Sequence, residues 1–310
     1  MTKAEQRDVA GPTLAVATAR LATTRVAAFA RGAALMLLAA SPVVRAPLAA
    51  QAPPQDLPAA RAAWERSPRN VDSIIWFGRR TAYTGAFADA VVIYTEGLRL
   101  HPDEPHLLRH RGHRYISLRQ YPLAIRDLSR ALGVVGGAPD EIEPDGQPNA
   151  RGIPTSTLHG NIRYHLALAY FLTGEFARAA ALWEDDARLA RNLDHRVAAT
   201  HWAVIAHGRA GDLDKAKALL APIRADWDII ENGSYHQVLL WMKGERTDAQ
   251  IRSQMTAGTP AQTMANGMAQ WYLANGRRAE AERLFAEILA GERSASFGYL
   301  AAEAARRGMR

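Results

Sequence analysis

The sequence predicts an all-helical fold built from repeated helix pairs, and three observations support this. First, six turn residues, five of them glycine, are each followed five positions later by alanine. These pairs are Gly85/Ala90, Arg119/Ala124, Gly174/Ala179, Gly211/Ala216, Gly244/Ala249 and Gly276/Ala281. Second, successive turns are 34, 55, 37, 33 and 32 residues apart, so the long spacing is one period of 34 plus an insertion of 21. Third, apolar residues recur at helical spacing, and strand patterns are nearly absent.

The composition of the 310-residue chain is that of an ordinary globular protein, with 48% apolar and 22% charged residues. Cysteine is absent, which excludes disulfides, thiolate metal sites and cysteine nucleophiles. The formal charge is +7, but residues 1–50 carry six basic and two acidic side chains, which leaves +3 for the other 260 residues. So weak an excess provides no basic surface for phosphate groups, and nucleic acid is not expected as a partner.

Residues 1–50 have the pattern of a signal or targeting segment. Basic residues extend to Arg31, and thirteen uncharged residues, 32–44, follow. That run is too short to cross ~30 Å of hydrocarbon as a helix, but it has the size of the apolar region of a secretory signal. Cleavage is expected after Ala50. The sequence therefore predicts bacterial-type export to the periplasm or the medium, with no membrane span in the mature chain; the alternative is an N-terminal amphipathic or buried helix.

The remaining chain divides into a short linker and a long repetitive region. Residues 51–58 are rich in proline, which removes backbone donors and disfavours helix in the preceding residue, so we expect a linker there. Residues 59–310 carry the repeats. A half unit over 59–66 precedes the first complete repeat, and residues 294–307 have apolar side chains on one helical face, as expected of a helix that caps the end of the array.

The repeats share a pattern of small and large residues. The first unit reads Ile74-x2-Phe77-Gly78-x2-Thr81, then Ala90-x3-Tyr94, Gly97 and Pro102. The second reads Leu108-x2-Arg111-Gly112-x2-Tyr115, then Ala124-x3-Leu128. The third, fourth and sixth units follow with small substitutions, and the fifth is weakest because Ser253 stands where a large apolar residue is expected. This pattern resembles the tetratricopeptide repeat, a unit of two antiparallel helices.

The resemblance implies a right-handed α-solenoid of about six repeats with a C-terminal capping helix. It also implies that Gly78 and Gly112 are small because the second helix of each pair approaches them closely. In tetratricopeptide proteins the first helix of each unit lines a concave groove that binds peptides. The candidate groove residues carried over are Arg79, Tyr83, His106, Arg109, His113, Tyr164, His201 and Arg209.

The insertion over 133–155 is rich in glycine and proline and carries four carboxylates, at Asp140, Glu141, Glu143 and Asp145. Their spacing lacks the pattern of a calcium loop, so we expect a solvated, mobile acidic loop. The alternatives are a metal site and a loop that folds over the groove and regulates it.

Three histidines, His106, His110 and His113, follow one helical stripe, but a stripe of this kind spreads ligands over two turns and lacks the Glu of a metalloprotease motif. No nucleophile elbow, Ser-x-x-Lys motif, phosphate loop or dinucleotide glycine cluster is present in the sequence. We therefore expect no catalysis, no cofactor and no metal ion.

Three functional hypotheses follow from the sequence. The first is an exported scaffold that binds a peptide segment or a partner protein through its concave groove. The second is a self-associating assembly subunit of an envelope complex, with an oligomer formed through the convex or end surface. The third, a hydrolase or metal-dependent enzyme, lacks a recognisable constellation of residues.

Overall fold

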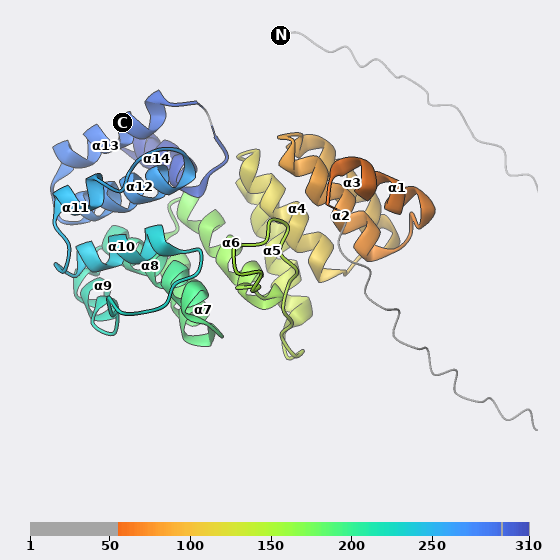
Figure 1. Ribbon diagram of the computed structural model, residues 1–310, viewed down its shortest axis with the longest axis horizontal. Coiled ribbons are helices and arrows are strands. Elements are labelled where there is room, and N and C mark those ends of the chain that lie inside the picture. The colour runs from red at the N-terminus through yellow and green to blue at the C-terminus, as the bar shows by residue number, and fades with distance from the viewer. Residues whose placement is uncertain (1–54, 293, 310) are drawn as a thin grey trace, which may run out of the picture. The chain divides into compact units, whose positions relative to one another are not determined.

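The computed structural model describes residues 55–292 and 294–309 (Figure 1). The expected signal segment, 1–50, lies outside the described residues. Within these residues, fourteen α-helices form and no strand does; the only β-like feature among them is an isolated bridge between Ile142 and Thr157. The predicted all-α class is confirmed. No helix in this part of the chain combines the length and apolarity needed to cross a bilayer.

The helices follow one another as antiparallel pairs at the predicted positions. A single helix, α1 (Leu57–Arg66), comes first and includes the last two residues of the expected linker. The six pairs are α2 (Val71–Tyr83) with α3 (Phe87–Leu100), α4 (Pro105–Ser117) with α5 (Tyr121–Val135), α6 (Leu158–Leu172) with α7 (Phe176–Leu189), α8 (Leu193–Ala210) with α9 (Leu213–Leu220), α10 (Gly233–Met242) with α11 (Asp248–Arg252), and α12 (Gly258–Ala274) with α13 (Arg278–Ala290). Helix α14 (Phe297–Gly308) closes the array.

Left-handed backbone conformations break the helices at the predicted turns. Five of the six turn positions are glycines with φ between 75° and 89°, a region that costs glycine nothing. The sixth is Arg119, with φ 62°. This conformation costs a residue with a Cβ about 1–2 kcal/mol, so the other contacts of Arg119 must offset the strain.

Close approach within the first two pairs explains their small residues. A Cβ added to Gly112 on α4 would lie 2.6 Å from Cγ of Leu128 on α5, and one added to Gly78 on α2 would overlap the ring of Tyr94 on α3. The aromatic residues fill the remaining space: Trp183 and Trp202 stack with ring centroids 5.3 Å apart, and both are buried. The repeat register predicted from the sequence is therefore confirmed at these contacts.

The fifth pair departs from the pattern as its sequence suggests. Helix α11 has only five residues, and Ser253, which follows it, is exposed. With so little second helix, α12 packs directly against α10 and also against α8. A Cβ on Gly267 of α12 would lie 2.7 Å from both His201 of α8 and Val238 of α10.

Helix α14 caps the last pair and also reaches back to the middle of the array. It packs on α12 and α13, and it contacts α6 as well. The guanidinium of Arg119, at the α4/α5 turn, donates to the carboxylate of Glu303 at 2.9 Å and to the carbonyl of Ser294 at 2.8 Å. These bonds tie the C-terminal helix to the second repeat and hold Arg119 in its left-handed conformation.

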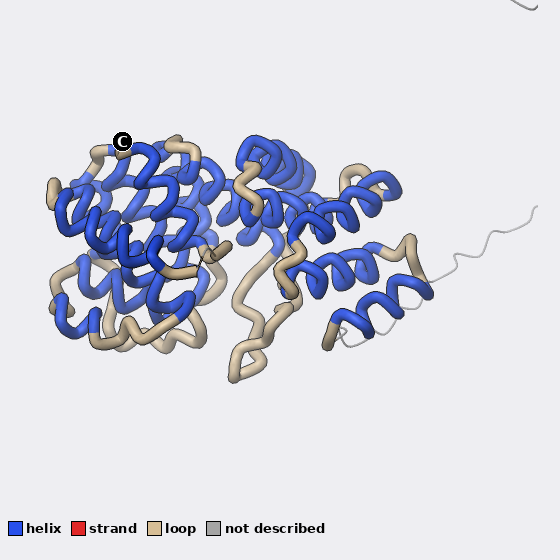
Figure 2. Tube along the Cα trace, turned by 90° about the horizontal axis from the view of Figure 1, so that it is seen from above, coloured by secondary structure: helices blue, strands red, loops and turns tan. Residues whose placement is uncertain are grey.

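The insertion runs from 136 to 157, slightly later than expected, because α5 continues to Val135 and α6 begins only at Leu158. It is the long tan segment between these helices in Figure 2. We call residues 136–157 the insertion loop. Asp140 accepts the backbone N–H of His159 in the first turn of α6, and Thr157 caps the same helix through the N–H of Gly160.

Candidate functional site

The eight predicted groove residues separate into three groups in the structure. Arg79, Tyr83, His106 and Arg109 lie on α2 and α4, next to the insertion loop. His113 and Tyr164 lie against α14. His201 and Arg209 belong to α8 and contact residues of neighbouring repeats. The predicted groove is therefore not one continuous open surface.

Glu143 of the insertion loop is the centre of the first group. Its side chain is 3% exposed, so the expectation that this acidic segment is solvated is wrong for Glu143. Nδ2 of Asn161 donates to its Oε2 at 2.6 Å, and Nε of Arg109 lies 3.2 Å from the same oxygen. Nε2 of His110 lies 3.0 Å from Oε1. A cation and two neutral donors thus surround one buried carboxylate.

The protonation states at this centre follow from its charges. Burial alone would raise the pKa of Glu143, but the charge of Arg109 and the contact with His110 hold that pKa well below its usual range. Burial, with a further effect of Arg109, lowers the pKa of His110 well below its ordinary value. A neutral His110 fits its two contacts, because Nδ1 can accept from Nη1 of Arg109 at 2.9 Å while Nε2–H faces the carboxylate.

The backbone of the same segment is held by arginines of α2. Nη1 of Arg79 donates to the carbonyl of Pro144 at 2.7 Å, and Nη1 of Arg80 donates to the carbonyl of Gly146 at 2.9 Å. The Arg79 guanidinium lies 4.5 Å from the centroid of the Trp76 ring. Gly146 is buried, and a Cβ there would overlap the Tyr83 hydroxyl. The loop therefore lies directly on the predicted groove residues.

His106 extends this contact toward the start of the loop. Its Nδ1 lies 2.7 Å from a carboxylate oxygen of Glu104, and its Nε2 lies 2.9 Å from one of Glu141. Burial opposes the charged form, but the hydrogen bond that His106 donates to Glu104 and the nearby carboxylates raise the pKa of His106.

Arg114, on the last turn of α4, was not predicted as a site residue. Its guanidinium lies 5.4 Å from the ring centroid of Phe87, and within the described part of the chain it makes neither a hydrogen bond nor an ion pair. Burial lowers the pKa of Arg114 to about 10, with Arg109 and Arg79 adding repulsion. We call Arg79, Arg109 and Arg114 the arginine site. It holds three positive charges, and the carboxylate of Glu143 contacts one of them, that of Arg109.

The second group is closed by α14. The ring of Phe297 lies 5.6 Å from that of His113 and 6.1 Å from that of Tyr164, measured between centroids. Burial, then the neighbouring charge of Arg114, lowers the pKa of His113 well below its ordinary value. The Tyr164 hydroxyl donates to that of Tyr235 at 3.3 Å. These two residues pack beneath the C-terminal helix.

The third group is part of the interior. His201 is fully buried between α8 and α12, so it offers no surface to a partner in this structure, and burial lowers its pKa to about 3. Nη1 of Arg209 donates to Oε1 of Gln270 at 2.6 Å, and the guanidinium lies 4.5 Å from the Phe176 ring centroid. Both residues join repeats together.

Comparison with known proteins concerns the fold. No family model matches the chain, and no curated protein matches it. Among solved structures, it is similar to the nearly identical tetratricopeptide-like repeats of a kinesin light chain from Podosopora anserina, with 16% identity and a TM-score of 0.44, over 78% of this chain and 98% of that one. It is also similar to a tetratricopeptide repeat protein from Parabacteroides merdae, with 15% identity and a TM-score of 0.45, over 80% and 91%. In this chain, the described helices themselves form the array of antiparallel pairs that the sequence predicted.

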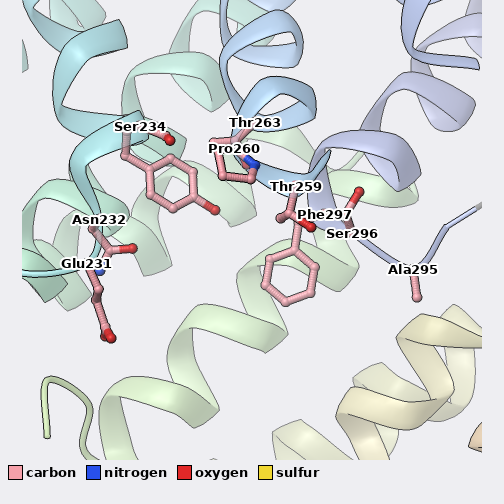
Figure 3. Close-up of a pocket in the computed structure, with 10 residues that line it drawn as sticks. Glu231, Asn232, Ser234, Thr259, Pro260, Thr263, Ala295, Ser296 and Phe297 are labelled. Atoms are coloured by element: carbon pink, nitrogen blue, oxygen red, sulfur yellow. The ribbon is translucent and has the colours of Figure 1, made fainter. Parts of the chain in front are cut away.

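The solenoid also contains a pocket of about 310 Å³ where α10, α12 and α14 begin (Figure 3). Tyr235, Pro260 and Phe297 form its apolar wall, and Glu231 contributes a carboxylate at one side. Both oxygens of Glu231 are occupied, because Thr155 and Asn149 of the insertion loop donate to them. The pocket is thus connected to the far end of the loop.

The three histidines on one stripe of α4 contact different partners. His106 contacts carboxylates, His110 contacts Glu143, and His113 contacts aromatic rings. Among the described residues, no group of three or more His, Asp or Glu side chains could hold a metal ion.

Arg114 and Glu143 could not be assigned to a site from the sequence alone. Arg114 occupies no recognised groove position, and Glu143 lies in a loop without periodicity. The sequence nevertheless contained a signal that the loop and the groove could meet. The loop carries four carboxylates and the predicted concave face carries several basic residues, in a chain of otherwise small net charge.

Proposed function

We propose that this protein is an exported, non-catalytic scaffold whose α2–α4 face binds an extended acidic segment of a partner protein. One observation carries the proposal: the face already holds such a segment, the residues 143–146 of its own insertion loop. A carboxylate is bound by Arg109 and Asn161, and a backbone carbonyl by Arg79. These contacts are of the kind that an extended peptide makes with a recognition groove.

The charge of the site supports an acidic partner rather than a neutral one. Arginine presents several N–H donors in a planar fork that suits carboxylates, and charge-assisted hydrogen bonds are stronger than neutral ones. The arginine site keeps Arg114 without an acceptor in the described structure. Of the eight sequence-predicted residues, the proposal uses Arg79, Tyr83, His106 and Arg109.

Export is the part of the proposal that rests on the sequence. Its support is the basic stretch up to Arg31, the thirteen uncharged residues that follow, and the small residues before Gln51. Intact-mass measurement of the protein from its native host tests it. The mature protein should lack residues 1–50, and a mass of the full 33.9 kDa in the soluble cytosol would exclude processing.

Affinity capture from the native envelope tests the binding function. Arg114→Gln should reduce recovery of the partner by at least about tenfold, the loss expected when a charge-assisted contact is removed. Arg283→Gln, on the exposed side of α13, removes the same charge elsewhere and should have no effect. Added salt should weaken capture by the unaltered protein, because it screens the same attraction. Equal recovery with both variants would place the interface outside the arginine site.

A second candidate function, self-association, is favoured by the N-terminal end of the solenoid. Apolar grooves of about 630 and 560 Å³ lie among α1, α2 and α3, and both include Phe77, Val92 and Ile93. Val92 is 60% exposed. A second copy of the chain would cover this surface. Light scattering after size exclusion would then give a dimer that Val92→Asp converts to a monomer; a monomer before substitution excludes this role.

A further inference from the structure

We propose that residues 141–146 act as an intramolecular competitor, which occupies the arginine site until an acidic peptide displaces it. This inference rests on the proposed function, since it concerns how the same site is controlled and what chemistry its partner must have. The occupant is a short extended stretch, Glu-Ile-Glu-Pro-Asp-Gly, that lies across α2, α4 and the start of α6.

The stretch lies between two independent anchors. Before it, Asp140 accepts from the N–H of His159, and its carbonyl accepts from Arg191 at 3.0 Å. After it, Arg151 forms a two-bond ion pair with Asp228, with both distances 2.7 Å, and Nδ2 of Asn192 donates to the carbonyl of Thr155 at 2.8 Å. Because neither anchor uses the arginine site, residues 141–146 can leave that site while the loop stays attached at both ends.

The contacts of Glu143 are incomplete for a carboxylate so deeply buried. Nε of Arg109, Nε2 of His110 and Oε1 of Glu143 are buried, and none of them makes a well-directed hydrogen bond within the described residues. Nε2 of His110 lies 3.0 Å from Oε1 and Nε of Arg109 lies 3.2 Å from Oε2, but neither N–H is directed well enough at its oxygen to form a hydrogen bond. Buried polar atoms left in this state cost free energy, so the loop fills the site without satisfying it.

The two other arginines of the site form even fewer contacts with acceptors. Arg79 donates to a neutral carbonyl, and Arg114 has no acceptor among the described residues. Asp145, the next carboxylate in the stretch, leaves its buried Oδ2 without a hydrogen-bond partner in the same part of the chain. An incoming peptide with carboxylates placed for Arg79 and Arg114 would therefore gain ion pairs that the loop does not make.

These gains matter because the loop competes as part of the same chain. A tethered segment acts at an effective concentration in the millimolar range, so an external ligand must bind more favourably to replace it. The apparent dissociation constant of that external ligand is its intrinsic dissociation constant divided by the fraction of protein molecules with an open site. Weakening the loop alone should raise apparent affinity, and removing Arg114 alone should lower it.

The probe for this test is the loop itself as a free, end-blocked peptide spanning residues 139–147. Its binding is measured by calorimetry with the unaltered protein and with Glu143→Gln, which keeps the shape of the side chain and removes its charge. Glu143→Gln should bind the peptide at least about tenfold more tightly. Adding Arg109→Gln should reverse most of that gain, because Arg109 is the cation that contacts the Glu143 carboxylate of this sequence. Glu282→Gln, a change at a partly exposed surface ion pair on α13, is the matched control and should behave as the unaltered protein.

Hydrogen exchange of the unaltered protein gives a readout that does not depend on any variant folding. The amide of Glu143 donates to the carbonyl of Ser156 at 3.1 Å, and displacement of the stretch breaks that bond. Saturating peptide should therefore accelerate exchange at this amide while leaving amides inside α4 and α6 protected.

The outcomes separate this inference from the proposed function. Equal affinity of the unaltered protein and Glu143→Gln, or bound peptide without faster exchange at Glu143, would overturn the competitor and leave the scaffold function standing. Absence of peptide binding to both, with unfolding curves unchanged, would overturn the competitor as well. The scaffold function fails separately, when envelope capture proves indifferent to Arg114.

Discussion

A single added methyl group should have opposite effects at two helical glycines of the same repeat, Gly112 on α4 and Gly133 on α5. A Cβ on Gly112 would lie 2.6, 3.1 and 3.3 Å from Cγ, Cδ2 and Cδ1 of Leu128, a fully buried side chain. A Cβ on Gly133 meets nothing within 4 Å. The local chemistry of Gly→Ala is the same at both positions, so any difference measures the contact between α4 and α5.

The expected magnitudes follow from two opposing terms. Replacing glycine by alanine inside a helix stabilises it by roughly 0.5–1 kcal/mol, because the unfolded chain loses freedom. Gly133→Ala should show this gain. At Gly112 the three close approaches force Leu128 or the whole of α5 to shift, and overpacking of this kind costs about 1–3 kcal/mol. Once the helix gain is subtracted, Gly112→Ala should be destabilised by about 0–2.5 kcal/mol.

Urea unfolding followed by circular dichroism measures both free energies, with equal m-values required for the comparison. The midpoint should rise for Gly133→Ala and fall for Gly112→Ala. A rise for both variants would show that α4 and α5 do not meet at Gly112, and the repeat register would then be wrong.

Three further predictions concern other parts of the chain. Arg119→Gly relieves the left-handed strain that Arg119→Ala keeps, while both lose the bond to Glu303; the alanine variant should unfold about 1 kcal/mol more easily than the glycine variant in the same urea assay, and equal stability would refute the strain. The pKa of Glu143 is lower in the folded protein, so its ionised form stabilises the fold above the ordinary carboxyl pKa of about 4.3, and this contribution disappears as the pH falls from about 5 toward the folded value. Acid titrations should therefore show a shallower loss of stability for Glu143→Gln, and parallel curves would contradict the shift. Asp186, fully buried, pairs with Arg163 at 3.1 Å and His195 at 2.8 Å; Asp186→Ala should cost about 3–5 kcal/mol because it strands a buried charge, and a calorimetric loss below 1 kcal/mol would refute that pairing.

The repeat architecture could be predicted because its determinants are local. A turn that needs a left-handed residue selects glycine, as at Gly85 and Gly174, and a helix that must approach its neighbour selects a small residue, as at Gly112. Both requirements recur every 34 or so residues, so the period is visible without knowledge of distant contacts. Even the weak fifth unit was visible, through Ser253, and its second helix is the shortest of the described helices.

The candidate site was predictable only in part. Arg79 and Arg109 followed from their place on the first helix of each pair, and the structure brings them together under the loop. His201 occupies on α8 the repeat position that Arg109 occupies on α4, yet it is buried by a helix, α12, rather than by the loop. The two residues share a repeat position but have different neighbours. Helix α12 packs directly on α8, because α11 is too short to separate these two helices.

The sequence by itself determined the helix pairs, their turns and the small contacts inside each pair, since all of these depend on residues within about one repeat. Tertiary structure alone decided which first-helix residues remain accessible. Helix α14 meets α6 through contacts more than a hundred residues apart in sequence, and Glu143 meets Arg109, which lies 34 positions earlier in the chain. Such contacts depend on the rotation that accumulates from one repeat to the next, and on which charged side chains pair when they are buried. Neither of these repeats along the sequence, so a periodic sequence pattern does not predict them.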